Sequence, residues 1–332
     1  MEKVLVTGAT GYIGLHCIQQ LLEQGYSVNG SVRSPERKEE IFDALKNHGT
    51  PTDELSLFTF NLNEDDGWDD GMQGCDYLLH VASPIALQRH SEEFFVKPAV
   101  AGVKRALKFA KKHSVKKVVL TSSVAAISSG HTKKQFSEED WSKVDQPIPA
   151  YPKSKALAEK KAWDLINNSN KKTKLTVINP AGVIGPSLTS EVSSTQLIIS
   201  GLVNGKIPIN LPIHIGYVDV RDVALAHVKA LESPKSDGER IILSCTELWT
   251  KDVSKILREN GYNAPRFSAS VGVAKFLSNF IPILKPSKRF FGKAMTKNST
   301  KAEDILGIKY IDVSKSIIDE VESLKRFDKF SG

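Results

Sequence analysis

The fold is decided near the amino end of the sequence, by the stretch Val4-Leu5-Val6-Thr7-Gly8-Ala9-Thr10-Gly11-Tyr12-Ile13-Gly14. This stretch joins an apolar, strand-like run to a helical pattern through three glycines spaced three residues apart. Such glycines allow a tight turn, let the backbone approach a diphosphate and let the helix pack closely on the sheet. The spacing alone is weak evidence, because chance would produce it in a chain of this composition about one time in ten. The order of strand, glycines and helix favours a dinucleotide-binding turn over a turn without a ligand.

Strand-like runs alternate with helical patterns through the first half of the chain. We expect strands over residues 4–7, 27–32, 55–60, 77–82, 117–122 and 175–179. We expect helices over residues 13–24, 94–112 and 154–167. Several of these strands are apolar on both faces, which is typical of a parallel sheet that is covered on both sides. The alternation predicts an α/β fold, a doubly wound parallel Rossmann sheet with helices on both faces.

The alternation lapses after Pro186. Residues 187–216 contain Gly and Pro punctuation and no clear strand–helix unit, and residues 262–300 are irregular and basic. Between and after them we expect helices over 218–231, 249–260 and 314–324, and a strand over 241–244. Since these segments leave the sheet and return to it, they predict a smaller C-terminal substrate-capping region rather than a separate domain.

This pattern also predicts how the chain is divided. Residues 1–185 and 217–248 would form the dinucleotide-binding Rossmann domain, and residues 186–216 and 249–332 the substrate-binding and capping region. The substrate pocket would be lined from residues 124–131, 186–216 and 262–300.

Composition excludes several classes of protein. The 332 residues are 40% hydrophobic and 25% charged, as in an ordinary globular enzyme, and no apolar run reaches the roughly 18 residues of a membrane span. Because the amino end lacks the apolar core of a signal peptide, we expect a cytoplasmic protein without a membrane partner. Cys17, Cys75 and Cys245 are widely spaced, which predicts free thiols and no metal site.

The formal net charge is +7, and we attribute much of it to Lys-Lys doublets at positions 111–112, 116–117 and 171–172. The doublets lie at expected helix ends or in turns and lack interleaved aromatic residues, so we expect no nucleic-acid partner. A basic surface that attracts an anionic cofactor or substrate is the better interpretation.

The end of the second expected strand indicates which dinucleotide binds. An Asp or Glu there would bind an adenosine ribose hydroxyl and favour NAD. Here the strand ends in Val32-Arg33-Ser34, and Arg37 and Lys38 follow. A guanidinium suits a 2′-phosphate, so the sequence favours NADP(H) over the alternative of a solvated basic turn.

Tyr151 and Lys155 form a candidate proton-handling pair. They are four residues apart on an expected helix, a step of about 40° of rotation and roughly 6 Å of rise, so both lie on one face. Of the seven tyrosines, only Tyr151 has a lysine four residues on. The strand over 117–122 brings Ser122 and Ser123 to its carboxyl end, where open α/β sheets bind their ligands.

The chemistry of carbonyl reduction explains these residue types. Hydride transfer needs a proton for the developing alkoxide, and tyrosine, with a pKa of about 10, can donate one. A nearby ammonium is expected to lower that pKa, and a shift of about two units corresponds to roughly 3 kcal/mol. The lysine can also bind the nicotinamide ribose, and a serine hydroxyl can steady the substrate oxygen.

Several further motifs carry a resemblance to a known family. They include His80-Val81-Ala82-Ser83-Pro84, Leu120-Thr121-Ser122-Ser123, Tyr151 through Lys155 with Ala158-Glu159-Lys160, Asn179-Pro180, Gly185-Pro186 and Tyr217-Val218-Asp219-Val220-Arg221-Asp222. With the glycine motif, they span nearly the whole chain and are jointly specific. The sequence resembles the extended short-chain dehydrogenases/reductases, specifically the dihydroflavonol-4-reductase-like branch. That branch includes cinnamoyl-CoA reductases and microbial aldehyde, ketone and methylglyoxal reductases.

The resemblance implies roles for individual residues. It makes Ser123 the catalytic serine, Tyr151 the acid/base and Lys155 its assistant. It implies cofactor contacts, beyond Tyr151 and Lys155 themselves, from Gly8, Thr10, Gly11, Tyr12, Ile13, Gly14, Arg33, Lys38, Asn61, Leu62, Val81, Ala82, Ser83, Pro180, Val183 and either Ser194 or Thr195. The sequence departs from the family pattern at Asn61, often Asp in relatives, and at Ser128, which disfavours a flavonoid substrate.

We therefore expect a reductase that uses NADPH to convert an aldehyde or ketone to an alcohol, acting as a monomer or homodimer. A sugar-nucleotide epimerase or dehydratase that retains NAD⁺ is the nearest alternative, and Arg33 argues against it. A non-catalytic NADP(H) sensor is the alternative from another class, and the intact Tyr151 and Lys155 pair argues against that one.

Overall fold

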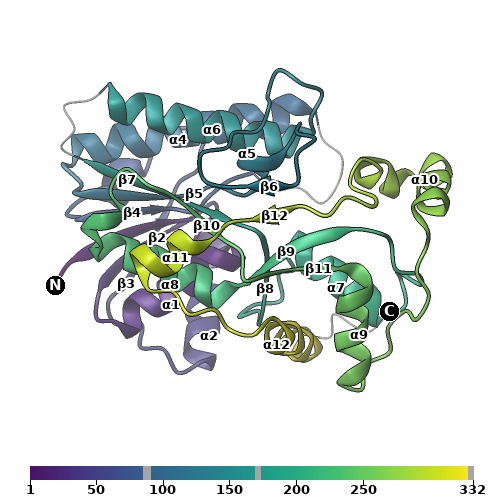
Figure 1. Cartoon of the computed structure of the whole chain (residues 1–332). Helices are drawn as coiled ribbons and strands as arrows, with labels where there is room; N and C mark the ends of the chain where they lie inside the picture. Colours follow the sequence, from purple (N-terminus) through teal and green to yellow (C-terminus); the bar gives the residue numbers. More distant parts are fainter. Residues whose placement is uncertain (85–90, 169–172, 328–332) are drawn as a thin grey trace.

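The computed structural model describes residues 1–84, 91–168 and 173–327 (Figure 1). The Lys171-Lys172 doublet lies outside these residues. At the level of architecture, a large parallel sheet occupies one part of the molecule and a smaller mixed sheet adjoins it (Figure 1).

The large sheet has seven strands, all parallel, in the order β10-β7-β5-β4-β1-β2-β3. Its strands are β1 (Lys3–Thr7), β2 (Ser27–Val32), β3 (Leu55–Thr59), β4 (Tyr77–His80), β5 (Lys117–Thr121), β7 (Lys174–Pro180) and β10 (Arg240–Leu243). Each corresponds to an expected strand, with ends that differ by one or two residues. The prediction of a doubly wound parallel Rossmann sheet is confirmed.

Helices cover both faces of this sheet (Figure 1). On one face lie α3 (Trp68–Met72), α4 (Glu92–Lys112) and α6 (Ala150–Asn167), and on the other α1 (Tyr12–Glu23), α2 (Lys38–Asn47), α8 (Val220–Glu232) and α11 (Thr300–Leu306). Each layer encloses its own apolar core, and the strands contribute alternate residues to the two cores. Leu5 and Val6, for example, point into opposite cores, as the two-residue period of a strand requires.

The region after Pro186 is more regular than expected. A three-stranded sheet in the order β11-β9-β8 is formed by β8 (Gly182–Ile184), β9 (His214–Asp219) and β11 (Thr246–Trp249). It packs with α7 (Ser194–Val203), α9 (Thr250–Glu259) and α12 (Val313–Arg326) around a third core. Residues 187–216, in which the sequence showed no clear strand–helix unit, contain α7 and the start of β9. The helix expected from residue 218 begins at Val220, because β9 continues through Asp219, whose carboxylate caps the helix.

Residues 262–300 also contain regular structure that the sequence analysis did not predict. They form α10 (Val271–Phe280), a 3₁₀ helix (Pro282–Ser287) and β12 (Thr296–Lys297), which pairs with β6 (Gln135–Phe136). The remaining short elements are α5 (Ala125–Ser128) and two 3₁₀ helices, Pro35–Arg37 and Pro234–Ser236. The division of the chain into two domains stays a prediction. Several elements cross it, since β8, β9 and β11 form one small sheet although the division separates their residues, and α11 packs on β10 and α8.

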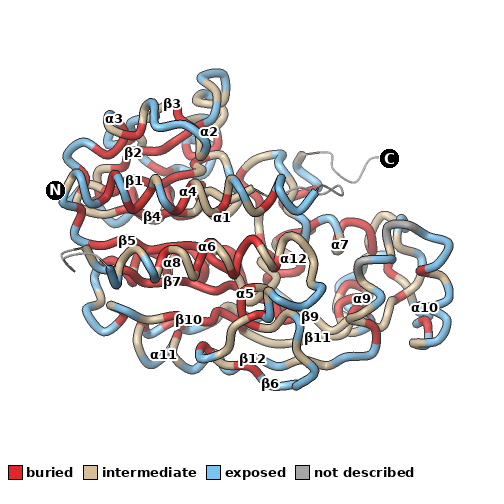
Figure 2. The backbone as a smooth tube through the Cα atoms, turned by 90° about the horizontal axis from the view of Figure 1, so that it is seen from above, coloured by how far each residue is buried: buried red, intermediate tan, exposed pale blue. Residues whose placement is uncertain are grey.

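Burial follows these layers. The strands of the large sheet, apart from the edge strand β3, are buried almost throughout, whereas much of α10, at one end of the molecule, is exposed (Figure 2). Among the described residues, no helix is both long and apolar enough to cross a bilayer.

Candidate active site

The glycine loop after β1 has the geometry that close backbone approach requires. Gly8 has a φ of +77°, which side-chain-bearing residues rarely adopt, and its N–H donates to the Ser31 hydroxyl at 3.0 Å. A Cβ at Gly8 would lie 3.1 Å from the Cα of Ala82, and one at Gly14 would lie 2.2 Å from the Gly8 carbonyl oxygen. The glycines are therefore needed both for the turn and for the packing of α1 on it.

The first turn of α1 presents backbone N–H groups to the loop. The helix begins at Tyr12 with neither a side-chain cap at Gly11 nor an acidic residue in its first turn, so its positive end is available to an anion. Thr10 and Ile13, also predicted to bind the cofactor, are half-buried on either side of this helix start. The Tyr12 hydroxyl donates to the Gly185 carbonyl at 2.7 Å, so the side chain itself fixes the chain after β8.

The predicted adenosine-side residues follow β2 and β3, which are neighbours in the sheet. Arg33 is exposed and, among the described residues, makes no ion pair, whereas Arg37 bridges Glu40 and Glu191, with 2.9 Å to each. Lys38 is half-buried at the first position of α2.

Asn61 and Leu62 are held by local contacts. The Asn61 carboxamide oxygen accepts the backbone N–H of Asn63 at 2.7 Å, and its amide donates to Glu64 at 3.2 Å. The Leu62 side chain packs against Gly102 of α4. Each of these bonds uses one of the two positions at its end of the carboxamide, so the Asn61 side chain can still donate to and accept from adenine.

Residues after β4 join the glycine loop to the catalytic candidates. Val81, Ala82 and Ser83 are half-buried, and the Ala82 N–H donates to the Thr7 hydroxyl at 3.1 Å. Ala82 and Ser83 line a narrow cavity together with Thr121, Ser122 and Lys155. The structure thus brings the β4 and β5 ends and α6 to one place, as the parallel sheet predicts.

Ser123, Tyr151 and Lys155 meet where β5 and α6 come together. Ser123 follows β5 by two residues, and its hydroxyl is close enough to the phenol of Tyr151, in the first turn of α6, to influence the pKa of that phenol. Lys155, one turn further on, is buried, and its Nζ donates to the Thr121 carbonyl at 3.2 Å. This Nζ lies 6.0 Å from the centre of the Tyr151 ring, so the two side chains share a face without direct contact.

The expected lowering of the pKa of Tyr151 is wrong for this structure. Burial raises the pKa of Tyr151 above its usual 10, and the nearby Ser123 hydroxyl opposes the rise only in part. Lys155 is not among the causes of this shift, and burial lowers the pKa of its own ammonium to about 8 while the carboxylate of Glu159 acts in the opposite direction. Tyr151 is therefore a protonated phenol near neutral pH, which suits a proton donor.

Sequence reasoning missed a buried network behind Lys155, centred on Glu159. The Glu159 carboxylate accepts from Ser122 and from the amide of Asn179, the latter at 2.9 Å, and pairs with Arg240 of β10 at 2.5 Å. The Asn179 amide also donates to the Ser123 carbonyl at 3.3 Å. The Arg240 guanidinium in turn lies 3.7 Å from the centre of the Trp141 ring. Glu159 thereby joins the serine loop, α6 and the edge strand of the sheet.

The predicted nicotinamide-side residues adjoin the loop that follows Ser123. Pro180 ends β7, and its carbonyl accepts the N–H of Val124 at 3.0 Å, while Val183 lies in β8. Of the two α7 candidates, Ser194 is exposed, whereas the γ-methyl of Thr195 would be 3.5 Å from a Cβ at Gly182. The geometry favours Thr195 over Ser194 as the residue that faces this side.

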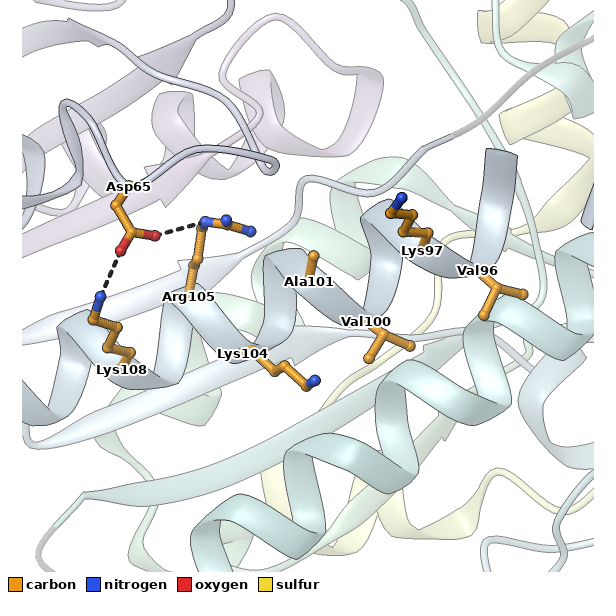
Figure 3. A pocket seen from close by; sticks show the side chains of 8 residues that line it. All are labelled: Asp65, Val96, Lys97, Val100, Ala101, Lys104, Arg105 and Lys108. Carbon is orange, nitrogen blue, oxygen red and sulfur yellow. Dashed lines mark hydrogen bonds and ion pairs between the residues drawn. The ribbon is translucent and has the colours of Figure 1, made fainter. Parts of the chain in front are cut away.

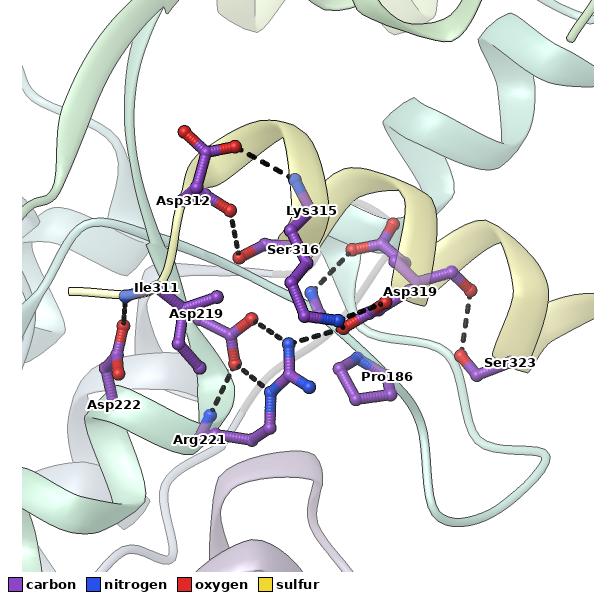
Figure 4. Close-up of polar contacts among 12 residues, drawn as sticks. Pro186, Asp219, Arg221, Asp222, Ile311, Asp312, Lys315, Ser316, Asp319 and Ser323 are labelled. Atoms are coloured by element: carbon purple, nitrogen blue, oxygen red, sulfur yellow. Dashed lines mark hydrogen bonds and ion pairs between the residues drawn. The ribbon is translucent and has the colours of Figure 1, made fainter. Parts of the chain in front are cut away.

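The motif from Asp219 to Asp222 is explained by packing of the C-terminal helix (Figure 4). Arg221 bridges Asp219 and Asp319 of α12, with 2.7 Å to each carboxylate. Asp222 accepts the Ile311 N–H at 2.9 Å, and burial raises the pKa of its carboxyl to about 6. These residues fix α12 to the start of α8 and thereby hold the loop after β8.

A second hollow, of about 510 Å³, lies along the outer surface of α4 (Figure 3). Asp65 at its rim pairs with Arg105 at 2.8 Å and with Lys108 at 2.5 Å. None of the predicted catalytic or cofactor residues lines it. Within the described part of the chain, no group of His, Cys, Asp and Glu side chains could hold a metal ion.

Comparison with known proteins agrees with this arrangement. Residues 4–244 match the model of the NAD dependent epimerase/dehydratase family. A putative NADPH-dependent methylglyoxal reductase of Candida albicans is 32% identical, over 97% of this chain and 98% of its own length. A cinnamoyl-CoA reductase of Medicago truncatula is 33% identical, over 97% of this chain and 95% of its own.

The solved structures agree as well. The structure of yeast methylglyoxal/isovaleraldehyde reductase Gre2 complexed with NADPH matches with a TM-score of 0.80 at 28% identity, over 99% of each chain. Fold, site geometry and relatives lead to one conclusion: the chain is an oxidoreductase of the NAD-dependent epimerase/dehydratase family, in the dihydroflavonol-4-reductase-like branch of the extended short-chain dehydrogenases/reductases.

Proposed function

We propose that the protein reduces an aldehyde or a ketone to an alcohol with NADPH as the hydride donor. The observation that carries the proposal is the grouping of Ser123, Tyr151 and Lys155 at the carboxyl end of β5, beside the glycine loop. The methylglyoxal reductases among its relatives support both the cofactor and the class of reaction.

The residues around the glycine loop fit a dinucleotide phosphate. Gly8, Gly11 and Gly14 leave a cradle that a Cβ at any of them would narrow, and the start of α1 offers N–H groups to a diphosphate. Arg33, exposed and without an ion pair among the described residues, would hold the 2′-phosphate that distinguishes NADPH from NADH. Lys155 would bind the nicotinamide ribose. When bound, NADPH supplies the hydride that adds to the carbonyl carbon.

Tyr151 provides the proton that completes the reduction. Because burial raises its pKa, the phenol is protonated near neutral pH and donates to the carbonyl oxygen as negative charge develops there. The Ser123 hydroxyl, which lies near the Tyr151 phenol, orients the same oxygen. Lys155, with a pKa of about 8, is mostly protonated at pH 7, so its ammonium is available to donate to the nicotinamide ribose.

The direct test is a panel of aldehydes, ketones and diketones, each assayed by loss of NADPH absorbance, with NADH in parallel. We expect turnover of at least one carbonyl and a clear preference for NADPH. Tightly bound NAD⁺ in the purified protein would favour an epimerase or dehydratase instead. NADPH binding without reduction of any carbonyl in the panel would favour a regulatory sensor.

A further inference from the structure

The basic charge of the protein comes from one segment, residues 260–302. This segment contains eight Lys and Arg residues and neither Asp nor Glu, and six of the eight lie in residues 266–293, whereas Lys301 pairs with Glu239. Without these eight, the 45 basic residues of the chain become 37, against 38 acidic residues, so the rest of the chain is nearly neutral. The attribution of the charge to the Lys-Lys doublets is therefore wrong. Lys112 pairs with Asp69, and Lys116 pairs with Glu2 and Asp76.

Within this segment, α10 has two apolar faces. Val271, Ala274 and Ser278 recur at helical spacing and face a small core that includes Phe291. The opposite face carries another series at the same spacing, Val273, Phe276 and Phe280. One face thus holds the helix to the protein, and the other is directed away from it.

The outward face is strongly exposed. Phe276 is 62% exposed, Phe280 68% and Val273 49%, and the two phenylalanine rings contact each other with centres 5.0 Å apart. Nearby in the chain, Phe267 is 78% exposed and Ile281 40%. These five residues account for most of the large apolar side chains that are exposed among the described residues. A concentration of this kind marks an interaction surface rather than scattered surface residues.

The position of α10 makes this face accessible. The helix projects from the end of the molecule that lies away from the large sheet and the amino terminus (Figure 1). Figure 2 shows it at the outer edge from a second direction, with exposed residues along its length. Lys275 is exposed on the helix itself, and Lys288 donates to Asn279 at 2.9 Å, so cations flank the apolar face.

We propose that α10 and its basic flanks form a docking surface for an anionic lipid membrane. An interfacial helix places aromatic and aliphatic side chains at the boundary between headgroups and acyl chains, and flanking lysines contact the anionic headgroups. This arrangement needs no spanning helix. It departs from the expectation of no membrane partner, which rested on the lack of a spanning segment and of a signal peptide.

The charge distribution favours lipid over other occupants. In a symmetric contact between two copies of the chain, this patch would face itself, and the positive charge of residues 260–302 would oppose the same charge. Nucleic-acid binding uses separate aromatic rings on which bases stack. Here the rings contact each other and lie beside aliphatic side chains, which suits acyl chains better. The surface contains none of the proposed catalytic residues, although it lies within the segment 262–300 that we expect to line the substrate pocket. Vesicle binding is measured without substrate, so its outcome does not depend on the proposed function.

Co-sedimentation of the full chain with vesicles tests the proposal. Vesicles of phosphatidylcholine alone are compared with vesicles of phosphatidylcholine and phosphatidylserine in equal parts, at low and high salt. We expect binding to the anionic vesicles, little binding to the neutral ones, and release at high salt. The double variant F276S/F280S should lose binding, whereas Leu197→Ser, at an exposed apolar residue of α7, should keep it.

Charge reversal measures the electrostatic contribution to vesicle binding separately from the contribution of the apolar face. The K275E/K285E variant should bind anionic vesicles at least about tenfold more weakly, since each cation near the surface contributes about fivefold. The K46E/K111E variant makes the same charge change at exposed lysines elsewhere and should bind within about threefold of the wild type.

Several outcomes would overturn the proposal. One is a wild-type chain that stays in the supernatant with both kinds of vesicle. Another is F276S/F280S binding as well as the wild type. A third is a wild-type dimer that F276S/F280S converts to a monomer, without vesicle binding by either, because the face would then join two copies. Retention of the wild type on single-stranded DNA but not on vesicles would likewise replace lipid by nucleic acid.

Discussion

Replacement of Glu159 by Gln tests the buried network that supports the catalytic helix. The Glu159 side chain is 0% exposed and its partner Arg240 only 9%, so their ion pair is buried. Gln can accept a hydrogen bond but carries no charge, and it would leave the Arg240 guanidinium buried without a carboxylate. Removing one partner of a buried ion pair costs about 3–5 kcal/mol. At an unfolding entropy of about 2.1 cal/mol/K per residue, this lowers the midpoint of thermal unfolding by about 4–7 °C.

The neighbouring pair of Glu239 and Lys301 provides a matched control. These side chains are 35% and 32% exposed, and the same change, Glu239→Gln, should cost less than about 1 kcal/mol. Both variants are compared with the wild type by scanning calorimetry at pH 7. If E159Q lowers the midpoint no more than E239Q, the network does not stabilise the fold as argued.

A second readout separates a positioning role of Glu159 from a purely structural one. Its carboxylate raises the pKa of Lys155, whose ammonium is otherwise lowered by burial to about 8. In E159Q the pKa of Lys155 should fall further, so the alkaline limb of the carbonyl reduction profile should move to lower pH. A structural defect alone would reduce the rate at every pH without moving that limb.

Three further changes test the cofactor site and the C-terminal attachment. Arg33→Ala should weaken NADPH binding about 10–100-fold, measured by calorimetry, because it loses a charged hydrogen bond to phosphate. Arg37→Ala loses only its carboxylate partners and should bind NADPH as the wild type does. Equal losses of affinity in the two variants would refute the assignment of Arg33 to the 2′-phosphate. Gly8→Ala should destabilise the fold by about 1–3 kcal/mol and weaken NADPH binding. Gly25→Ala, at a similar φ with nothing within 4 Å, should leave NADPH binding unchanged, and equal binding by the two variants would contradict the cradle. Asp222 has a folded pKa of about 6, above its usual 3.8, so the stability that its protonated form contributes is present below about pH 4 and is lost as the pH rises through about 6. In denaturant titrations at different pH, Asp222→Asn should remove this loss of stability between about pH 4 and 6. An unchanged pH dependence of stability in the variant would refute the role of Asp222.

The features that the sequence predicted well are those with local signals. The glycine spacing after β1 is a property of eleven consecutive residues, and the structure reproduces its turn, its contact with Ala82 and the helix that follows. The shared face of Tyr151 and Lys155 follows from helical geometry over four residues. Both the glycine turn and the shared helix face are determined by residues that are close together in the sequence.

The features that were missed depend on distant residues or on short elements. The start of helix α7 is marked in the sequence by the capping box of Ser193 and Gln196, and this signal was overlooked. Strand β8 has only three residues, too few for a hydrophobic pattern that would predict the small sheet. Glu159 finds Arg240 at a separation of 81 residues, which no local pattern encodes.

The direction of the Tyr151 pKa shift illustrates the same limit. The sequence indicated a nearby ammonium and hence a lower pKa, but the sign depends on how deeply both side chains are buried. The sequence likewise gives the net charge but not its location on the folded surface. Assigning it to a surface required knowing which lysines have acidic partners in the fold.

In the proposed mechanism Tyr151 donates the proton in carbonyl reduction, and the kcat of the Tyr151→Phe variant measures how much the reaction depends on that proton. The variant keeps the ring and loses only the hydroxyl. We predict a fall in kcat of about 10²–10⁴-fold, with NADPH still bound as judged by its fluorescence. Tyr77→Phe, which removes a phenol that contacts Glu2 away from the site, should keep wild-type turnover. Turnover by Tyr151→Phe within a few-fold of the wild type would contradict the account.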